Sequence, residues 1–356
     1  MDPRTASAGN PGSGQISETS KSASSAVEAN LLKTRESSLV SIVIPAYNAA
    51  KTLDRTLRSV SAQTYAAIEV IVVDDGSVDG SGEIARLHCL KDSRVRLIQT
   101  LNGGVASARN RGINEARGEF VAPVDADDLW APDKIEKQVS VLRKSGAQYG
   151  LCYTWSARIG PDDEIIADVP RIPIEGDVLL DLCRSNIIGN GSSALVRATV
   201  LDEVGLYDSS LRDQRAQGCE DWDIYLRIAE RYKFALVPEH LTGYRQYPGN
   251  MSSDVMQMYR SACIVLRRVG DRRPDLNTSL RRGETTMLRW LFLQSVEYGQ
   301  VKSATHLYRK LAKANQLEAL VSIARVTVRL ARNLKNAALE RFNRKRYFGA
   351  SLDERS

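Results

Sequence analysis

The sequence contains no run of about 18 consecutive apolar residues, so we expect no membrane-spanning helix. It also lacks the apolar core of a secretory signal peptide at its N-terminus. Its five cysteines are scattered and include no Cys-x-x-Cys pair, which favours a reducing compartment over a disulfide framework. These absences predict a cytoplasmic protein, with peripheral binding to the inner face of the membrane as an alternative.

The sequence also lacks a strong excess of positive or negative charge. The formal net charge is +6 over 356 residues, which does not indicate a nucleic-acid-binding protein. The positive charge gathers between residues 321 and 346, which hold eight Lys/Arg and one acid. Here Ile323 and Val326 lie on one predicted helical face and Arg325 on the other. Residues 317–346 could therefore lie on an anionic membrane or pack on their own domain.

The first 37 residues are poor in large apolar side chains and rich in Ser, Ala, Gly and Thr. Such a segment cannot bury enough surface to offset the entropy lost on ordering. We therefore predict a disordered tail over residues 1–37.

From residue 39 onward, runs of apolar, β-branched residues alternate with segments whose apolar residues recur at helical spacing. The predicted strands of this part are 39–45, 68–73, 95–98 and 120–124, and the predicted helices are 50–63, 81–90 and 105–116. This alternation predicts βαβ units and an α/β fold with a mostly parallel sheet. Later strands are expected at 150–155, 191–196 and 234–238, with a loop or hairpin over 160–176 and a helix that ends at 231. Beyond residue 254 only helical patterns occur.

Two of the predicted strands end in acids, which are Asp74, Asp75, Asp125, Asp127 and Asp128. The carboxyl ends of parallel strands form the edge at which open α/β sheets bind ligands. Three acids within 125–128 repel one another unless a cation joins them, and a hard divalent cation takes one or two carboxylates together with phosphate oxygens and water. This cluster therefore suggests Mg²⁺ or Mn²⁺ holding a phosphorylated substrate. The alternative is an acidic turn that caps the next helix, near Pro132 and Asp133.

Six short motifs follow one another along the chain. They are 41–48 (SIVIPAYN), 72–77 (VVDDGS), 102–104 (NGG) with 108–110 (ARN), 125–128 (DADD), 220–222 (EDW) and 244–245 (YR). In this order and spacing, the sequence resembles family 2 inverting glycosyltransferases of the GT-A fold over residues 39–253. The resemblance implies a Rossmann-like, mostly parallel sheet flanked by helices. By this resemblance, residues 38–253 form the glycosyltransferase domain, with a nucleotide half (38–130) and an acceptor half (131–253). A helical basic region over 254–356 follows this domain.

The resemblance also implies a pocket for the nucleotide base. Pro45, Ala46 and Tyr47 would line this pocket. Asp75 would accept a hydrogen bond from the base ring, and Asp74 is the less favoured choice for that role. The alternative for both acids is an ordinary turn, because Asp and Gly are favoured turn residues.

The resemblance assigns three further residues to the ribose, the diphosphate and the metal. Arg109 would approach the diphosphate, Asp125 would face the ribose, and Asp127 of the Asp-x-Asp motif would bind the metal. The alternative for Arg109 is a solvated helix charge. Asp128 would support the metal ligand or cap a helix.

The catalytic base of the family corresponds to Asp221, with Glu220 as the second choice. A carboxylate that takes the acceptor hydroxyl's proton typically contributes roughly 10²–10⁴-fold to the rate. The alternative for both acids is favourable negative charge at a helix N-terminus. Trp222 would stack on a sugar or belong to the core.

The implied activity is metal-dependent, inverting transfer of a sugar from a nucleotide-sugar, expected to be UDP-linked, to a hydroxyl of a glycan or lipid-linked glycan. Such a reaction would serve the synthesis of cell-surface polysaccharides or glycoconjugates. A nucleotidyltransferase is the first alternative, but residues 45–48 lack the Gly and Lys of a triphosphate loop. A binding protein that kept the fold is the second, and the presence of Asp127 and Asp221 argues against it.

The chain departs from the family pattern in two places. The run 244–248 contains no His, which many members carry there, and His240 upstream is expected to be structural. Processive members have a Gln-x-x-Arg-Trp motif. Here Thr286 replaces its Gln, so we interpret Arg289 and Trp290 as coincidental and expect a non-processive enzyme.

Overall fold

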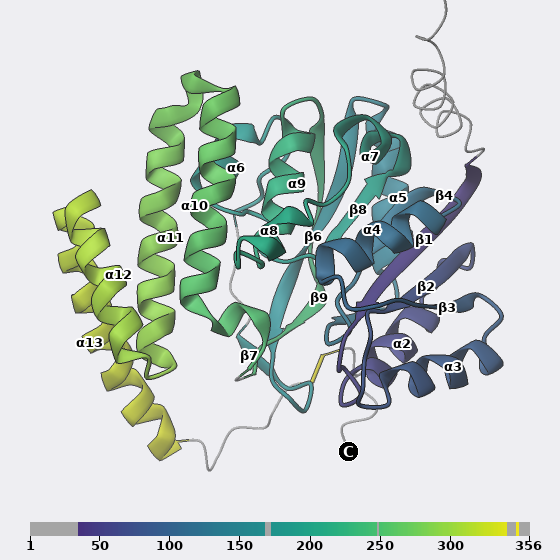
Figure 1. The fold of residues 1–356 in the computed structure, drawn as a ribbon, viewed down its shortest axis with the longest axis horizontal. Helices are drawn as coiled ribbons and strands as arrows, with labels where there is room; N and C mark the ends of the chain where they lie inside the picture. Colours follow the sequence, from purple (N-terminus) through teal and green to yellow (C-terminus); the bar gives the residue numbers. More distant parts are fainter. Residues whose placement is uncertain (1–34, 168–171, 248, 340–346, 349–356) are drawn as a thin grey trace, which may run out of the picture.

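The computed structural model describes residues 35–167, 172–247, 249–339 and 347–348, whose strands form one sheet with helices on both faces (Figure 1). The strands are β1 (Glu36–Ala46), β2 (Ile68–Asp74), β3 (Val95–Gln99), β4 (Gly118–Pro123), β5 (Leu129–Trp130), β6 (Tyr149–Ile159), β7 (Ile165–Ala167), β8 (Ala194–Arg197) and β9 (Lys233–Arg245). Their order across the sheet is β3-β2-β1-β4-β8-β6-β9-β5, and β7 pairs with β6 beside this path.

The helices fall into two groups along the chain. Those around the sheet are α2 (Leu53–Ser61), α3 (Ser81–Lys91), α4 (Val105–Glu115), α5 (Lys134–Ser145), α6 (Leu179–Arg184), α7 (Ala198–Val204), α8 (Ser210–Asp213) and α9 (Glu220–Ala229). Four longer helices follow: α10 (Val255–Arg272), α11 (Asn277–Glu297), α12 (Val301–Ala314) and α13 (Gln316–Leu339).

The strands of the N-terminal half run parallel, as predicted. β1 pairs in parallel with β2 and β4, and β2 pairs in parallel with β3. β8 runs antiparallel to its neighbours β4 and β6, so the sheet as a whole is mixed. An antiparallel pair needs no crossover helix, which explains why the alternation of strands and helices in the sequence loosens after β4.

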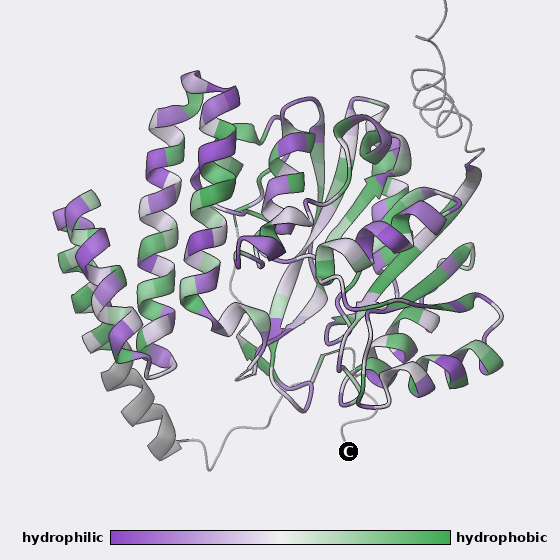
Figure 2. Cartoon of the chain, viewed as in Figure 1, coloured by the Kyte–Doolittle hydropathy of each residue, from purple (hydrophilic) through white to green (hydrophobic). Residues whose placement is uncertain are grey.

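The two faces of the sheet carry separate hydrophobic cores, because successive side chains of a strand point to opposite faces. In β1, Val43 belongs to the core under α4, α7 and α9, whereas Ile42 and Ile44 belong to the core under α2, α3 and α5. Figure 2 shows β1, β2 and β4 mainly in the colours of hydrophobic residues. The sheet is thus held by burial on both sides, which leaves its strand ends available for a site.

The helices after residue 254 pack against the α/β part and share its core. Val265 of α10, Leu291 of α11 and Leu311 of α12 belong to the same hydrophobic cluster as Val43. At Gly283, a Cβ atom would clash with the carbonyl oxygen of Cys183 near the end of α6. This approach of α11 to α6 needs a residue without a side chain.

The last helix, α13, has one packed face and one exposed face. Ala319 and Ser322 are buried, whereas Leu317, Leu320 and Val328 are 70%, 65% and 69% exposed. Within the described ranges, no helix is both long and apolar enough to cross a bilayer. The side chains of residues 329–346 lie outside the described part, and the membrane contact through 317–346 stays a prediction.

Several boundaries differ from the predicted ones. β1 begins at Glu36, inside the predicted tail, and residues 1–34 lie outside the described part. β9 continues to Arg245, past the predicted end at Pro238, because Val237 pairs with Thr154 of β6 and His240 with the next residue. Pro238 therefore sits in a bulge, where its missing N–H leaves no ladder bond unmade. The short elements β5, α6, α7 and α8 were not predicted, since so few residues show no hydrophobic period.

Candidate active site

A cleft of about 640 Å³ opens where the chain leaves β1, β2 and β4. The predicted site residues that line it are Pro45, Ala46, Tyr47, Asp75, Arg109, Asp125, Asp127, Glu220 and Asp221. Asp74 and Asp128 are the predicted residues that lie outside this lining. The strand ends thus bring together residues that are up to 176 positions apart in the chain.

The two acids after β2 have different partners. Asp75 accepts hydrogen bonds from the backbone N–H groups of Gly103 and Gly104 at 2.7 and 2.8 Å. Asp74 accepts one from the backbone N–H of Ser77 at 3.0 Å and one from Gln99 Nε2 at 3.2 Å. Asp74 therefore holds the turn after β2, while Asp75 orders the 102–104 loop and also faces the cleft. Gly104 has a φ of +87°, which favours glycine at this position.

Arg109 of α4 is buried between two carboxylates. Its guanidinium donates from Nη2 to Asp125 Oδ1 at 2.5 Å and from Nη1 to Glu220 Oε1 at 2.8 Å. It also lies over the ring of Tyr207, with 5.2 Å between the guanidinium carbon and the ring centroid. Burial lowers the pKa of Arg109, but the charges of Asp125 and Glu220 outweigh it and raise the pKa well above its ordinary value. Arg109 lines the cleft, yet its two Nη atoms already bond to acids, whereas the sequence led us to expect a diphosphate partner.

The acids at 125–128 precede β5 and do not cap the next helix, whose N-cap residue is Asp133. Asp128 is fully buried and accepts hydrogen bonds from Ser192 Oγ at 2.5 Å and from the backbone N–H of Arg245 at 2.9 Å. Arg245 Nε donates to the carbonyl oxygen of Asp127 at 2.6 Å. The Tyr-Arg motif at the end of β9 therefore fixes the backbone that presents Asp127.

Asp127 presents its carboxylate to the cleft and accepts a hydrogen bond from the Tyr247 hydroxyl at 3.1 Å. Burial, followed by the charge of Asp125, raises its pKa to about 6. In the part of the chain that the structure describes, no three side chains of metal-binding type form a cluster. A single carboxylate oxygen donor still fits Mg²⁺ or Mn²⁺, because these ions usually take one or two carboxylates and complete their coordination with substrate phosphates and water.

The two acids that begin α9 are both buried. Glu220 accepts hydrogen bonds from Arg109 and from the backbone N–H of Gly218, at 2.8 and 2.9 Å. Asp221 Oδ1 accepts one from the backbone N–H of Trp222 at 2.6 Å. Burial, followed by the charge of Glu220, raises the pKa of Asp221 to about 7. A base with a pKa near the working pH suits proton transfer.

The surroundings of Trp222 and His240 indicate structural roles for both side chains. Trp222 is 1% exposed and donates from Nε1 to the carbonyl oxygen of Leu182 at 2.9 Å. It belongs to the core, which decides between the two alternatives that the sequence left open. The ring of His240 packs against Trp155, with centroids 5.5 Å apart.

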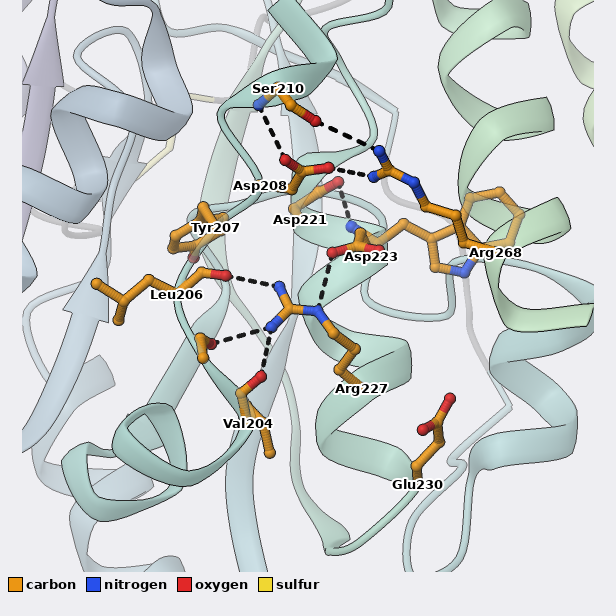
Figure 3. A network of polar contacts seen from close by, with 12 residues as sticks. Val204, Leu206, Tyr207, Asp208, Ser210, Asp221, Asp223, Arg227, Glu230 and Arg268 are labelled. Atoms are coloured by element: carbon orange, nitrogen blue, oxygen red, sulfur yellow. Dashed lines mark hydrogen bonds and ion pairs between the residues drawn. The ribbon is translucent and has the colours of Figure 1, made fainter. Parts of the chain in front are cut away.

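Sequence reasoning missed the network that supports α9 (Figure 3). Arg227 pairs with Asp223 at 2.9 Å and donates to the carbonyl oxygens of Val204, Gly205 and Leu206. Arg268 of α10 pairs with Asp208 a few residues further on. The network anchors the 204–210 loop, which carries the Tyr207 ring that packs against Arg109. The i,i+4 spacing of Asp223 and Arg227 is the one signal of it in the sequence.

Comparison with known sequences gives a family match. Residues 41–204 match the family described as glycosyl transferase family 2. The chain is 35% identical over 207 residues to an uncharacterized glycosyltransferase of Rickettsia conorii, a match that covers 57% of this chain and 32% of that protein. It is 29% identical over 196 residues to chondroitin synthase of Pasteurella multocida, covering 55% of this chain and 19% of that protein. The chain thus spans a third or less of the length of these relatives.

Solved structures share the fold. TarS 1–349 of S. aureus in complex with UDP-GlcNAc aligns with a TM-score of 0.56 and 14% identity, over 78% of this chain and 92% of that one. The mannosyltransferase PcManGT of Pyrobaculum calidifontis, in complex with GDP-Man and Mn²⁺, aligns with a TM-score of 0.51 and 19% identity, over 85% of each chain. The predicted GT-A fold is therefore confirmed.

Proposed function

Because residues 41–204 match glycosyl transferase family 2, we propose that this chain transfers a sugar from a UDP-sugar to a hydroxyl of a glycan or lipid-linked glycan. The observation that carries the proposal is the meeting of Asp75, Asp125, Asp127 and Asp221 in one cleft. These acids come from three separate motifs. Binding of the nucleotide-sugar donor, binding of a divalent cation and removal of the acceptor proton each need a carboxylate. The acceptor would belong to the synthesis of a cell-surface polysaccharide or glycoconjugate, as the likeness to chondroitin synthase suggests.

The nucleotide half would bind the donor. Tyr47 is 54% exposed and lines the cleft beside Pro45 and Ala46, so its ring is free to stack on a base. Asp75 would accept a hydrogen bond from the base, and its two backbone partners hold it in place. Asp125 would face the ribose, oriented by Arg109. The choice of UDP is supported by TarS, whose structure holds UDP-GlcNAc.

Asp221 would act as the base of a single displacement. The acceptor oxygen gives its proton to the Asp221 carboxylate and forms a bond to the anomeric carbon. The bond from that carbon to the diphosphate oxygen breaks, and its electron pair leaves with UDP. One displacement inverts the anomeric configuration, and we propose that one sugar is added per encounter.

Asp127 would hold a divalent cation together with the donor's diphosphate. When bound, Mn²⁺ or Mg²⁺ supplies Lewis-acid neutralisation of the negative charge on the leaving group. The Tyr247 hydroxyl and the Arg245 side chain keep Asp127 in position for this role.

Thermal unfolding with a nucleotide panel tests the proposal. UDP, UDP-glucose, UDP-GlcNAc and GDP-mannose are added with Mn²⁺, and a ligand at 100 times its Kd should stabilise the native state by about 2.7 kcal/mol. We expect a uridine nucleotide to raise the melting temperature and to release UDP when it carries a sugar. Tyr47→Ala should weaken this binding roughly tenfold through lost base stacking.

Val78→Ala is the matched control, because Val78 is 89% exposed and does not line the cleft. It should respond to the panel like the wild type. If no nucleotide raises the melting temperature and no UDP is released, the chain is not a nucleotide-sugar transferase.

A further inference from the structure

We propose that Asp163, in the turn between β6 and β7, is a positioning residue for the proposed metal ligand Asp127. Asp163 does not line the cleft, so its carboxylate does not reach the substrate. It acts instead through Arg245, whose Nε donates to the carbonyl oxygen of Asp127. This inference rests on the proposed function, in which Asp127 holds a divalent cation, and adds to it a residue that determines how firmly the cation is held.

The Arg245 side chain carries a positive charge into the protein interior. Arg245 is 1% exposed, and a buried charge is costly unless an opposite charge pairs with it. The hydrogen bonds of its guanidinium go to neutral carbonyl groups, which are those of Asp127, Gly160 and Pro161. The carboxylate of Asp163 forms an ion pair with Arg245 Nη2 at 2.6 Å and so supplies the negative charge.

The backbone of Asp163 indicates that the carboxylate is needed at this position. Its φ is +69°, in the left-handed region that favours glycine. Glycine would fit the turn with less strain, but it would leave Arg245 without its acid. Residues in such strained conformations persist where the surrounding structure holds them, and they cluster at functional sites.

The Asp163 carboxylate also connects the two halves of the domain. Its Oδ1 lies 2.8 Å from Arg55 Nη1 of α2, in the nucleotide half, and 2.6 Å from Arg245 Nη2 of β9, in the acceptor half. The backbone N–H of Phe348 donates to the carbonyl oxygen of Asp163 at 3.1 Å. A fixed series of contacts therefore runs from the turn through Arg245 to the backbone that presents Asp127.

Binding of Mn²⁺ at saturating UDP, followed by the electron paramagnetic resonance signal of free Mn²⁺, tests the assignment. Asp163→Asn removes the charge and keeps the shape, and Asn tolerates a positive φ. We expect its Kd for Mn²⁺ to rise roughly tenfold or more, because partners that orient metal ligands usually contribute 10–100-fold to metal affinity. Asp163→Gly should show the same rise. Affinity for UDP without metal should stay unchanged in both variants, and saturating Mn²⁺ should restore most of the turnover.

Hydrogen exchange of the ligand-free protein measures the positioning without nucleotide or metal. The backbone N–H of Arg245 donates to Asp128 Oδ1 at 2.9 Å and is part of the same arrangement. In Asp163→Asn, the peptides that contain Arg245 and residues 125–128 should exchange faster than in the wild type, because their local opening costs less free energy.

Two matched controls use the same Asp-to-Asn change. Asp162→Asn removes an equal charge from the neighbouring, exposed residue. Asp92→Asn breaks an ion pair of 2.8 Å with Arg94, away from the cleft lining. Both controls should keep the wild-type Kd for Mn²⁺ and the wild-type exchange of Arg245.

Three results would overturn the assignment. They are an unchanged Kd for Mn²⁺ in Asp163→Asn, an equal rise in either control, and unchanged exchange of Arg245 in Asp163→Asn. A wild type that binds UDP but not Mn²⁺ would exclude Asp127 as a metal ligand, and the assignment would fail with it. A wild type that binds no nucleotide would contradict the proposed function, and the exchange of Arg245 alone would then decide whether Asp163 positions Asp127.

Discussion

Replacement of Asp221 by Asn should make the protein more stable and the reaction slower. Burial and the neighbouring charge of Glu220 raise the pKa of Asp221 to about 7, against an ordinary value of 3.8. A carboxyl group whose pKa is higher in the folded than in the unfolded state binds its proton more tightly when folded. It therefore destabilises the fold as the pH rises from about 4 to 7, and the loss is complete above pH 7.

The size of the effect follows from the two pKa values. Each pKa unit is worth about 1.4 kcal/mol, so the difference sets an upper limit of roughly 4 kcal/mol at pH 8. Burial of the Asn amide in place of the carboxyl group has a desolvation cost of its own, so we expect a gain of about 2 kcal/mol for Asp221→Asn, a large value for a single substitution. Asn can keep the hydrogen bond from the Trp222 N–H through its Oδ1. Loss of the base should slow transfer by roughly 10²-fold or more without weakening donor binding.

Thermal unfolding at pH 4 and pH 8, together with transfer rates and donor calorimetry at pH 8, measures both parts. Asp221→Asn should raise the melting temperature at pH 8 and change it little at pH 4. Asp223→Asn is the matched control: it lies buried on the same helix, but it pairs with Arg227, so its loss should destabilise the protein. Equal stability of Asp221→Asn and the wild type at pH 8, or transfer at the wild-type rate, would refute the assignment of a buried base.

Three further predictions concern the supporting residues. Asp127→Asn should abolish Mn²⁺-dependent UDP release without lowering the melting temperature, because the raised pKa of Asp127 means that its charge does not stabilise the fold, and retained activity would exclude it as a metal ligand. Glu220→Gln should move the acidic limb of the pH–rate profile to lower pH, because a negative charge beside the base is lost. Arg109→Gln should move this limb to higher pH, because a positive charge is lost. Shifts of the two variants in the same direction would contradict the assignment of Asp221 as the base. Gly283→Ala should lower the free energy of unfolding by about 1–3 kcal/mol, because its Cβ would clash with the Cys183 carbonyl oxygen, and a stable variant would show that α11 can shift.

Most of the fold and much of the site could be predicted from local patterns. Strand runs such as 39–45 and 68–73 are long enough to show their type, and their acidic ends predicted the edge of the sheet at which the cleft opens. The pair Asp74-Asp75 marks the limit of this reasoning. Both acids follow the same strand, yet only Asp75 lines the cleft, because neighbouring residues leaving a strand point in different directions.

The sequence by itself determined the longer strands and helices, the sheet edge and the residue types gathered there, since each depends on contacts or periods within a few residues. Only the tertiary structure decided which charges meet. Arg109 bonds Glu220, 111 positions away, and no local pattern could show that its guanidinium is taken up by acids. The same holds for Trp290, which lines the cleft only because Gly283 lets α11 approach α6. Both side chains are placed by long-range packing, because their positions depend on how the helices pack against the sheet and against one another.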